Sequence, residues 1–168
     1  MADIHDNVMS VASGSMWCED SLNTNRIFSG RLSYDKGAAI IHTMRYLIND
    51  DVTFFNVLKQ YQQIFADSTA HASDFKNVLE NVTGMDFSPF FTEWYYGEGF
   101  PTYSAEWNQT NSNVLIEITQ LTSMPSSVLF FTNDLDVKII GTDGSSVIQR
   151  VEISALNQMV SIPFCTIH

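Results

Sequence analysis

Histidine, cysteine and acidic side chains most often hold a catalytic metal ion, and the chain has four histidines: His5, His42, His71 and His168. No two of them have the i, i+4 spacing that places two ligands on one helix face, and no H-E-x-x-H sequence occurs. His42 stands in a segment otherwise rich in apolar residues, where a structural histidine is the simpler interpretation. The sequence therefore predicts no metal site within this chain.

The sequence also lacks the usual signatures of a nucleophile or a phosphate-binding loop. It has no G-x-S-x-G, and neither Cys18 nor Cys165 has a local sequence typical of a catalytic cysteine. The two cysteines are compatible with one disulfide or with two free thiols, and two free thiols is the simpler interpretation. Gly97 and Gly99 follow a predicted helix instead of preceding one, which indicates a turn and no cofactor-binding loop.

One tyrosine stands where a helix should begin, in the sequence LSYDKGAAIIH at residues 32–42. An aromatic residue at a helix start is usually a core residue with its hydroxyl at the surface. The alternative is that Tyr34 faces a catalytic cavity. There, a neutral phenol hydroxyl can donate a hydrogen bond to a developing anion. Local spacing does not choose between these two interpretations.

The apolar residues that precede Gly99 recur with helical spacing. We predict helices that begin at Tyr34, after the NDD sequence at 49–51, after an N-cap at Ser73 and near Asp86. We also predict a short helix over 3–11 and a loop over 13–29.

The residues that follow Pro101 alternate in polarity or form short β-branched runs separated by turn sequences. They predict an antiparallel β-sandwich. The predicted strands are Thr102–Asn108, Val114–Leu121, Val128–Thr132, Leu135–Ile140, Val147–Ile153 and Gln158–Pro163. The expected fold class is α+β, with a helical bundle-like domain over 1–99 and a β-sandwich domain over 100–168.

An ordered set of motifs resembles the region downstream of the zinc motif in M1-family (gluzincin) aminopeptidases. That family has a Y-x-K-G-A helix start, an F…Y helix, a D-F helix and an F-F-x-x-W…G-x-P helix that leads into a β-sandwich. The matching residues are Tyr34, Lys36, Gly37 and Ala38, then Phe55 and Tyr61, Asp74 and Phe75, and finally Phe90, Phe91, Trp94 and Pro101. The resemblance is close over about residues 26–110, and it is the order of the motifs that makes it specific.

This resemblance implies a function for Tyr34 and a cofactor outside the chain. In the family, zinc is held by the H-E-x-x-H histidines and a later glutamate, and a tyrosine hydroxyl donates to the oxyanion of the tetrahedral intermediate. Tyr34 matches that tyrosine. The chain then corresponds to a C-terminal part of a zinc metallo-aminopeptidase that hydrolyses N-terminal residues from peptides. With the zinc ligands upstream of Met1, we expect the isolated chain to be inactive and its sandwich to be incomplete.

Composition limits the remaining alternatives. A net charge of −11 with only 8 Lys and Arg residues argues against nucleic acid as a partner. No apolar run approaches the roughly 20 residues of a membrane-spanning helix. The low lysine content and the Gly, Thr, Ser and Asn content of the predicted sandwich favour an exported protein. Two alternatives to the enzyme are a non-catalytic protein-interaction module and an M1-like pseudoenzyme, and the sequence upstream of Met1 would discriminate among the three.

Overall fold

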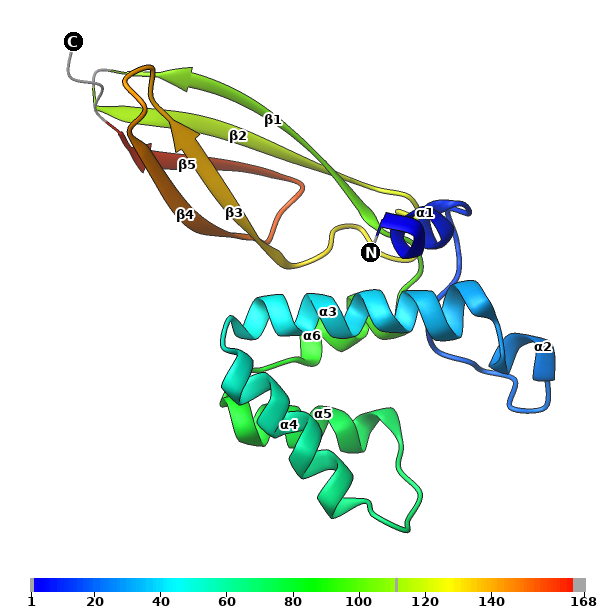
Figure 1. Cartoon of the computed structure of the whole chain (residues 1–168). Coiled ribbons are helices and arrows are strands. Elements are labelled where there is room, and N and C mark those ends of the chain that lie inside the picture. Colours follow the sequence, from blue (N-terminus) through cyan, green and yellow to red (C-terminus); the bar gives the residue numbers. More distant parts are fainter. Residues whose placement is uncertain (1, 111, 165–168) are drawn as a thin grey trace. The chain divides into compact units, whose positions relative to one another are not determined.

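The computed structural model describes residues 2–110 and 112–164, and it divides the chain into two compact units, Met1–Glu98 and Gly99–His168. Helices build the first unit, and antiparallel strands in two sheets build the second (Figure 1). The predicted α+β fold class is therefore confirmed. Each unit has a hydrophobic core of its own.

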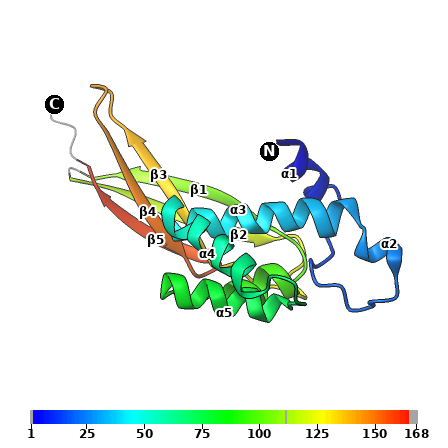
Figure 2. The same cartoon turned by 60° about the horizontal axis from the view of Figure 1, so that its bottom comes forward.

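Helices of two kinds make up the first unit. Its elements are α1 (Ala2–Met9), α2 (Thr24–Ile27), the π-helical segment η1 (Gly30–Asp35), α3 (Lys36–Ile48), α4 (Asp51–Ile64), α5 (Ala72–Thr83), α6 (Ser88–Phe90) and the π-helical segment η2 (Phe91–Tyr96). Helix α4 packs against both α3 and α5, and Figures 1 and 2 show α4 and α5 side by side. The segment predicted as a loop over residues 13–29 contains the short helix α2. Among the described residues no helix is long and apolar enough to span a bilayer.

The buried core of the helical unit is formed by residues of α3, α4, α5 and the segment around α6. Its residues are Ile40 and Met44 of α3, Val57 of α4, Val78 and Leu79 of α5, and Phe87, Phe90 and Phe91 around α6. These apolar residues recur three or four positions apart, which is the spacing that places side chains on one helix face. Trp94 lies at the edge of this core, half-buried, and its ring stacks on Phe90 with centroids 5.8 Å apart.

Short polar sequences set where the helices begin and end. Asn49 has φ 52°, a left-handed conformation that ends α3, and the Asp50 carboxylate accepts from Val52 N and Thr53 N at 3.2 Å to start α4. The prediction that Ser73 caps α5 is wrong. His71 takes the cap position because the Asp74 carboxylate accepts from His71 N at 2.7 Å, so the helix begins at Ala72.

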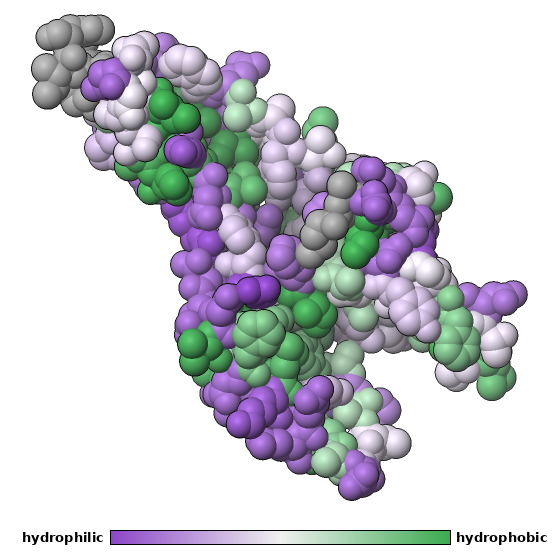
Figure 3. Space-filling model, in the orientation of Figure 1, coloured by the Kyte–Doolittle hydropathy of each residue, from purple (hydrophilic) through white to green (hydrophobic). Residues whose placement is uncertain are grey.

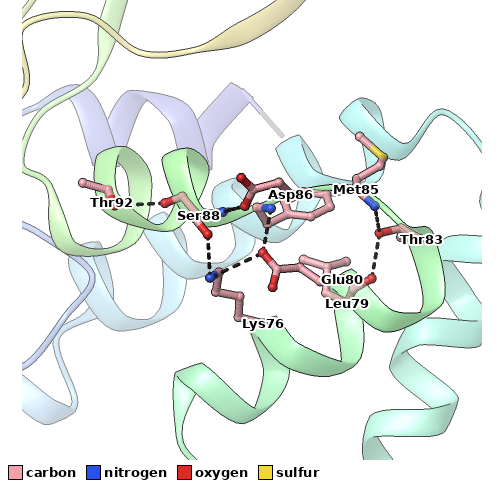
Figure 4. A network of polar contacts seen from close by, with 9 residues as sticks. Lys76, Leu79, Glu80, Thr83, Met85, Asp86, Ser88 and Thr92 are labelled. Atoms are coloured by element: carbon pink, nitrogen blue, oxygen red, sulfur yellow. Dashed lines mark hydrogen bonds and ion pairs between the residues drawn. The ribbon is translucent and has the colours of Figure 1, made fainter.

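Helix α5 is joined to α6 by the polar network in Figure 4. Lys76 Nζ donates to Ser88 Oγ at 2.8 Å and pairs with Glu80 at 3.4 Å. Glu80 in turn accepts from Phe87 N at 2.8 Å, while Asp86 accepts from Ser88 N at 2.8 Å. The predicted helix start near Asp86 is therefore a capped turn that leads into α6 and η2.

Within residues 99–110 and 112–164 the second unit has the strands β1 (Pro101–Gln109), β2 (Asn113–Thr122), β3 (Asn133–Ile140), β4 (Ser146–Ile153) and β5 (Asn157–Pro163). All pairs are antiparallel, in a three-stranded sheet of order β1-β2-β5 and a two-stranded β3-β4 sheet. The alternating residues of β2, β4 and β5 fill the core between the sheets. They include Ile116, Ile118, Ile153 and Ile162.

The predicted strand Val128–Thr132 is wrong, because a side chain takes the hydrogen bonds that a neighbouring strand would have made. Gln120, which is 1% exposed, accepts from Phe131 N at 2.5 Å and donates to Phe131 O at 2.9 Å. Phe131 is itself fully buried. The apolar run at 128–131 therefore packs into the unit as an irregular segment.

The sandwich is open along β1. Trp107 pairs with Ile116, so its side chain lies on the inner face of the sheet, yet it is 70% exposed. A cavity of about 930 Å³ lies beside it, lined by inner-face residues of β1, β2 and β3. The two-stranded sheet thus leaves part of the inner face of β1 uncovered. Figure 3 shows apolar side chains among polar ones on the molecular surface.

We predict that Gln120→Met destabilises the β unit by about 2–4 kcal/mol, because buried Phe131 then loses the two backbone hydrogen bonds that it makes with the Gln120 side chain. Denaturant unfolding measures this loss. Gln149→Met changes an exposed glutamine of β4 and is expected to stay within about 0.5 kcal/mol of wild type. Equal effects of the two substitutions would contradict the role given to Gln120.

Candidate functional site

Tyr34 lies in a π-helical turn that precedes α3. The Ser29 carbonyl accepts from both Ser33 N at 2.9 Å and Tyr34 N at 3.4 Å, and Ser29 Oγ accepts from Leu32 N at 3.2 Å. Residues 30–35 therefore form η1, and the α-helix predicted to start at Tyr34 begins only at Lys36. Short π-helical segments are rare and occur often at functional sites.

The side chain of Tyr34 is 59% exposed, so the helical unit does not use it as a core aromatic. Two residues later, Lys36 is 4% exposed. The turn thus presents a tyrosine outward and buries a lysine inward. Since both residues are fixed by the same turn, the contacts of Lys36 also determine how Tyr34 is held.

Buried Lys36 satisfies its amine with backbone oxygens. Nζ donates to Gly14 O at 2.8 Å and to Gly97 O at 3.3 Å. The pKa of Lys36 is lowered from 10.5 to about 8, mainly by burial and also by the nearby charge of Arg31, while the charge of Glu98 opposes both. A lysine enclosed in this way cannot reach a substrate, so its contribution is structural.

Both backbone polar groups of Gly14 are hydrogen-bonded to side chains. Its N–H donates to Glu98 Oε2 at 2.8 Å, while its carbonyl accepts from Lys36. Its φ is +106°, and a Cβ there would lie 2.8 Å from Leu32 Cδ2. Glycine adopts this φ without strain, whereas another residue would be strained and would also displace the Leu32 or Arg31 side chain.

Two arginines hold the carbonyls on either side of Gly14. Arg31 donates to Val8 O and Val11 O at 3.3 Å and to Ser13 O at 3.0 Å. Arg26 Nη2 donates to the next three carbonyls, those of Ser15 at 2.7 Å, Met16 at 2.9 Å and Trp17 at 2.9 Å. We call Arg26, Arg31 and Lys36 the cation clamp, and residues 11–17 the clamped loop.

The clamped loop also contacts α3 and η2. Met16 packs on Gly37 so closely that a Cβ at Gly37 would lie 3.2 Å from Met16 Cε. Trp17 N donates to Tyr95 O at 3.1 Å, and the Trp17 ring packs edge-on against Tyr96 with centroids 5.8 Å apart. Burial raises the pKa of Tyr95. The loop therefore ties together the turn before α3 and the end of η2.

The other residues considered from the sequence do not gather at this turn. In the part of the chain that the structure describes, no group of three or more His, Cys, Asp or Glu residues could hold a metal ion. His42 is exposed on α3. Cys18 forms no disulfide with a described residue and donates to Asp20 O at 3.3 Å. Cys165 and His168 lie outside the described residues.

Sequence reasoning missed the cation clamp. The signal was present, since Arg26, Arg31 and Lys36 are spaced by five residues in a chain with only 8 basic residues. A loop without regular structure needs donors for those of its carbonyls that are shielded from water. Arginine and lysine residues that cluster close to such a loop in the sequence are candidates for donating hydrogen bonds to its carbonyls. They need not be surface charges alone.

Comparison with known proteins places the helical unit in a family. Residues 2–94 match the model described as peptidase family M1 domain. A leucyl aminopeptidase of Saccharolobus solfataricus is 31% identical over 70 residues, covering 42% of this chain and 9% of the relative. Aminopeptidase M1-C of Oryza sativa subsp. japonica is 32% identical over 75 residues, covering 45% of this chain and 8% of the relative. The chain thus spans less than a tenth of these relatives.

A solved structure has a similar fold. Legionella pneumophila aminopeptidase A, crystallised in complex with aspartic acid, superposes with a TM-score of 0.73 at 12% sequence identity. The similarity covers 95% of this chain and 18% of that structure. At this identity it shows a shared fold for the chain.

We predict that Lys36 makes the stability of the helical unit depend on pH. Its folded pKa of about 8 is below the value of 10.5 for a free lysine, so between these pH values the unfolded chain holds a proton that the folded chain has released. The free energy of unfolding of wild type, minus that of Lys36→Met, should therefore increase as pH rises through this range.

Denaturant unfolding of both proteins at about pH 7 and about pH 10 tests this expectation, because titrations common to both proteins cancel in the difference. A difference that stays constant, or that falls with pH, would contradict the burial described for Lys36.

Proposed function

The chain belongs to peptidase family M1, and we propose that it supplies the oxyanion-stabilising tyrosine, Tyr34, to a zinc aminopeptidase that removes N-terminal residues from peptides. One observation carries the proposal: the tyrosine of the Y-x-K-G-A motif is exposed, while the following Lys36 and Gly37 are buried. A motif whose lysine and glycine fix the backbone, and whose tyrosine is left accessible, suits a hydrogen-bond donor.

The task of Tyr34 would be to donate to the carbonyl oxygen as negative charge develops on it. A hydroxyl can make this bond without first gaining a proton, and the bond strengthens from substrate to tetrahedral intermediate. The donor must be held in place before the reaction begins. The hydrogen bond from Ser33 N to Ser29 O at 2.9 Å and the contacts of Lys36 with the clamped loop support that requirement.

The zinc implied by the family does not fit the residues described here, since they contain no cluster that could hold it. We place the zinc ligands and the general base elsewhere in the protein, and no step of the proposal passes through them. The short coverage of the relatives, 8–9% of their length, supports this division. The isolated chain is accordingly expected to hydrolyse no aminoacyl substrate.

Exposed apolar side chains support a larger catalytic assembly. The helical unit leaves several large hydrophobic residues at its surface: Trp17 at 43%, Leu22 at 88%, Phe28 at 67%, Val52 at 79% and Phe55 at 54% exposed. Exposed hydrophobic residues that lie together often mark interaction sites, and Val52 and Phe55 lie three positions apart on α4. Contact with the remainder of a catalytic domain would cover them.

We predict that Tyr34→Phe in the protein that contains the zinc-binding part lowers kcat by about 10²–10³-fold, or about 2.7–4 kcal/mol. The substitution removes one donor and keeps the ring. KM should change little, because the bond forms fully only as charge develops. Steady-state kinetics on aminoacyl substrates measures both constants.

Tyr61→Phe is the matched control, because Tyr61 packs between Phe65 and Phe75 in the helical core. It should leave kcat near wild type, and both variants should keep their zinc. A Tyr34→Phe protein with full zinc and undiminished kcat would refute the proposed role. Absence of peptidase activity in the folded, zinc-loaded wild type would instead favour a pseudoenzyme.

A further inference from the structure

We propose that Arg26 is a positioning residue for Tyr34, and that it acts by joining the clamped loop to the turn on which Tyr34 stands. This inference rests on the proposed function, since it assigns how the catalytic tyrosine is held. It adds a residue outside the Y-x-K-G-A motif. Neither the motif nor the helical pattern of the sequence points to Arg26.

The guanidinium group of Arg26 bridges two segments. Nη2 donates to three consecutive carbonyls of the clamped loop, from Ser15 to Trp17, at 2.7–2.9 Å. Nη1 donates at 3.0 Å to Ser33 Oγ, in the residue immediately before Tyr34. Ser33 Oγ returns a hydrogen bond to the Arg26 carbonyl at 3.2 Å. The residue that precedes Tyr34 is thus bonded to Arg26 in both directions.

This bridge compensates for a weakness of the turn. The π-helical hydrogen bond of Tyr34 N to Ser29 O is 3.4 Å long, at the weak end of the range for an N–H donor. Two neighbouring amides also share the same Ser29 carbonyl. The bond of Tyr34 N is therefore a weak restraint, and the Arg26–Ser33 pair supplies a second one, one residue away.

Arginine is suited to this position and lysine is not. The planar guanidinium presents donors in fixed directions, so one group can serve acceptors on two sides. A lysine at position 26 would keep the positive charge but would have to choose between the loop carbonyls and Ser33. Arg26→Lys therefore removes the bridge between the clamped loop and Ser33 while it keeps the positive charge at position 26.

A double-mutant cycle with Tyr34 tests the inference in the active protein. Arg26→Lys and, separately, Ser33→Ala should lower kcat by about ten- to a hundredfold with little change in KM, since a small misplacement of a catalytic group costs up to that much. In the Tyr34→Phe background the same substitutions should cost little more, because the hydroxyl that they position is already absent.

Arg45→Lys provides the matched control. Arg45 is bonded to Asp51 at 2.7 Å near the other end of α3, and its side chain is 38% exposed. The same exchange of arginine for lysine there should leave kcat unchanged in both backgrounds. Ser33→Ala removes only one hydroxyl, so it serves as the reporter should Arg26→Lys prove unstable by circular dichroism.

The possible results separate the inference from the function on which it rests. An equal fold-loss in both backgrounds would overturn the positioning role of Arg26, while leaving the role of Tyr34 intact. Wild-type kcat in both Arg26→Lys and Ser33→Ala would overturn it as well. Undiminished kcat in Tyr34→Phe alone would overturn the proposed function itself. The inference is supported if Arg26→Lys and Ser33→Ala lower kcat in the protein that has Tyr34 but not in the Tyr34→Phe variant.

Discussion

The structure of the helical unit depends on hydrogen-bond donors for the backbone carbonyls of the clamped loop, which has no regular secondary structure. Such carbonyls cannot pair with one another, and each one that the fold shields from water without a partner would cost free energy. Three cations meet this need in sequence order along the loop, with Arg31 before Gly14, Lys36 at Gly14 and Arg26 after it. Because all three cations flank or belong to the turn of Tyr34, satisfying the loop also fixes that turn.

The hydrogen bonds of the clamped loop require a buried lysine and a glycine with positive φ. Burial of Lys36 near Arg31 disfavours the charged amine, and the Glu98 charge offsets only part of that effect. Gly14 must adopt φ +106° in order to present its N–H to Glu98 and its carbonyl to Lys36. Desolvated charged groups and conformations that favour glycine are common at functional sites, where a rigid geometry is kept at some cost in stability.

The parts of the fold that follow from local patterns were predictable, and those that depend on single side chains were not. Helical and alternating apolar spacing predicted most helices and strands, and the order of motifs around Tyr34 indicated the family. Gln120 removed a predicted strand by bonding both backbone groups of Phe131 from another segment. The π-turn before Lys36 likewise depends on contacts with a loop about twenty residues earlier, which no local window contains.

Native-state hydrogen exchange of the backbone amides of Gly14, Trp17 and Tyr34 tests most directly whether loop and turn form one rigid body. If the cation clamp fixes them, these three amides should exchange with an opening free energy close to that of Ile40 and Met44, in the buried face of α3. Exchange of the three amides at the rate of an unprotected surface loop, while α3 stays protected, would contradict this account.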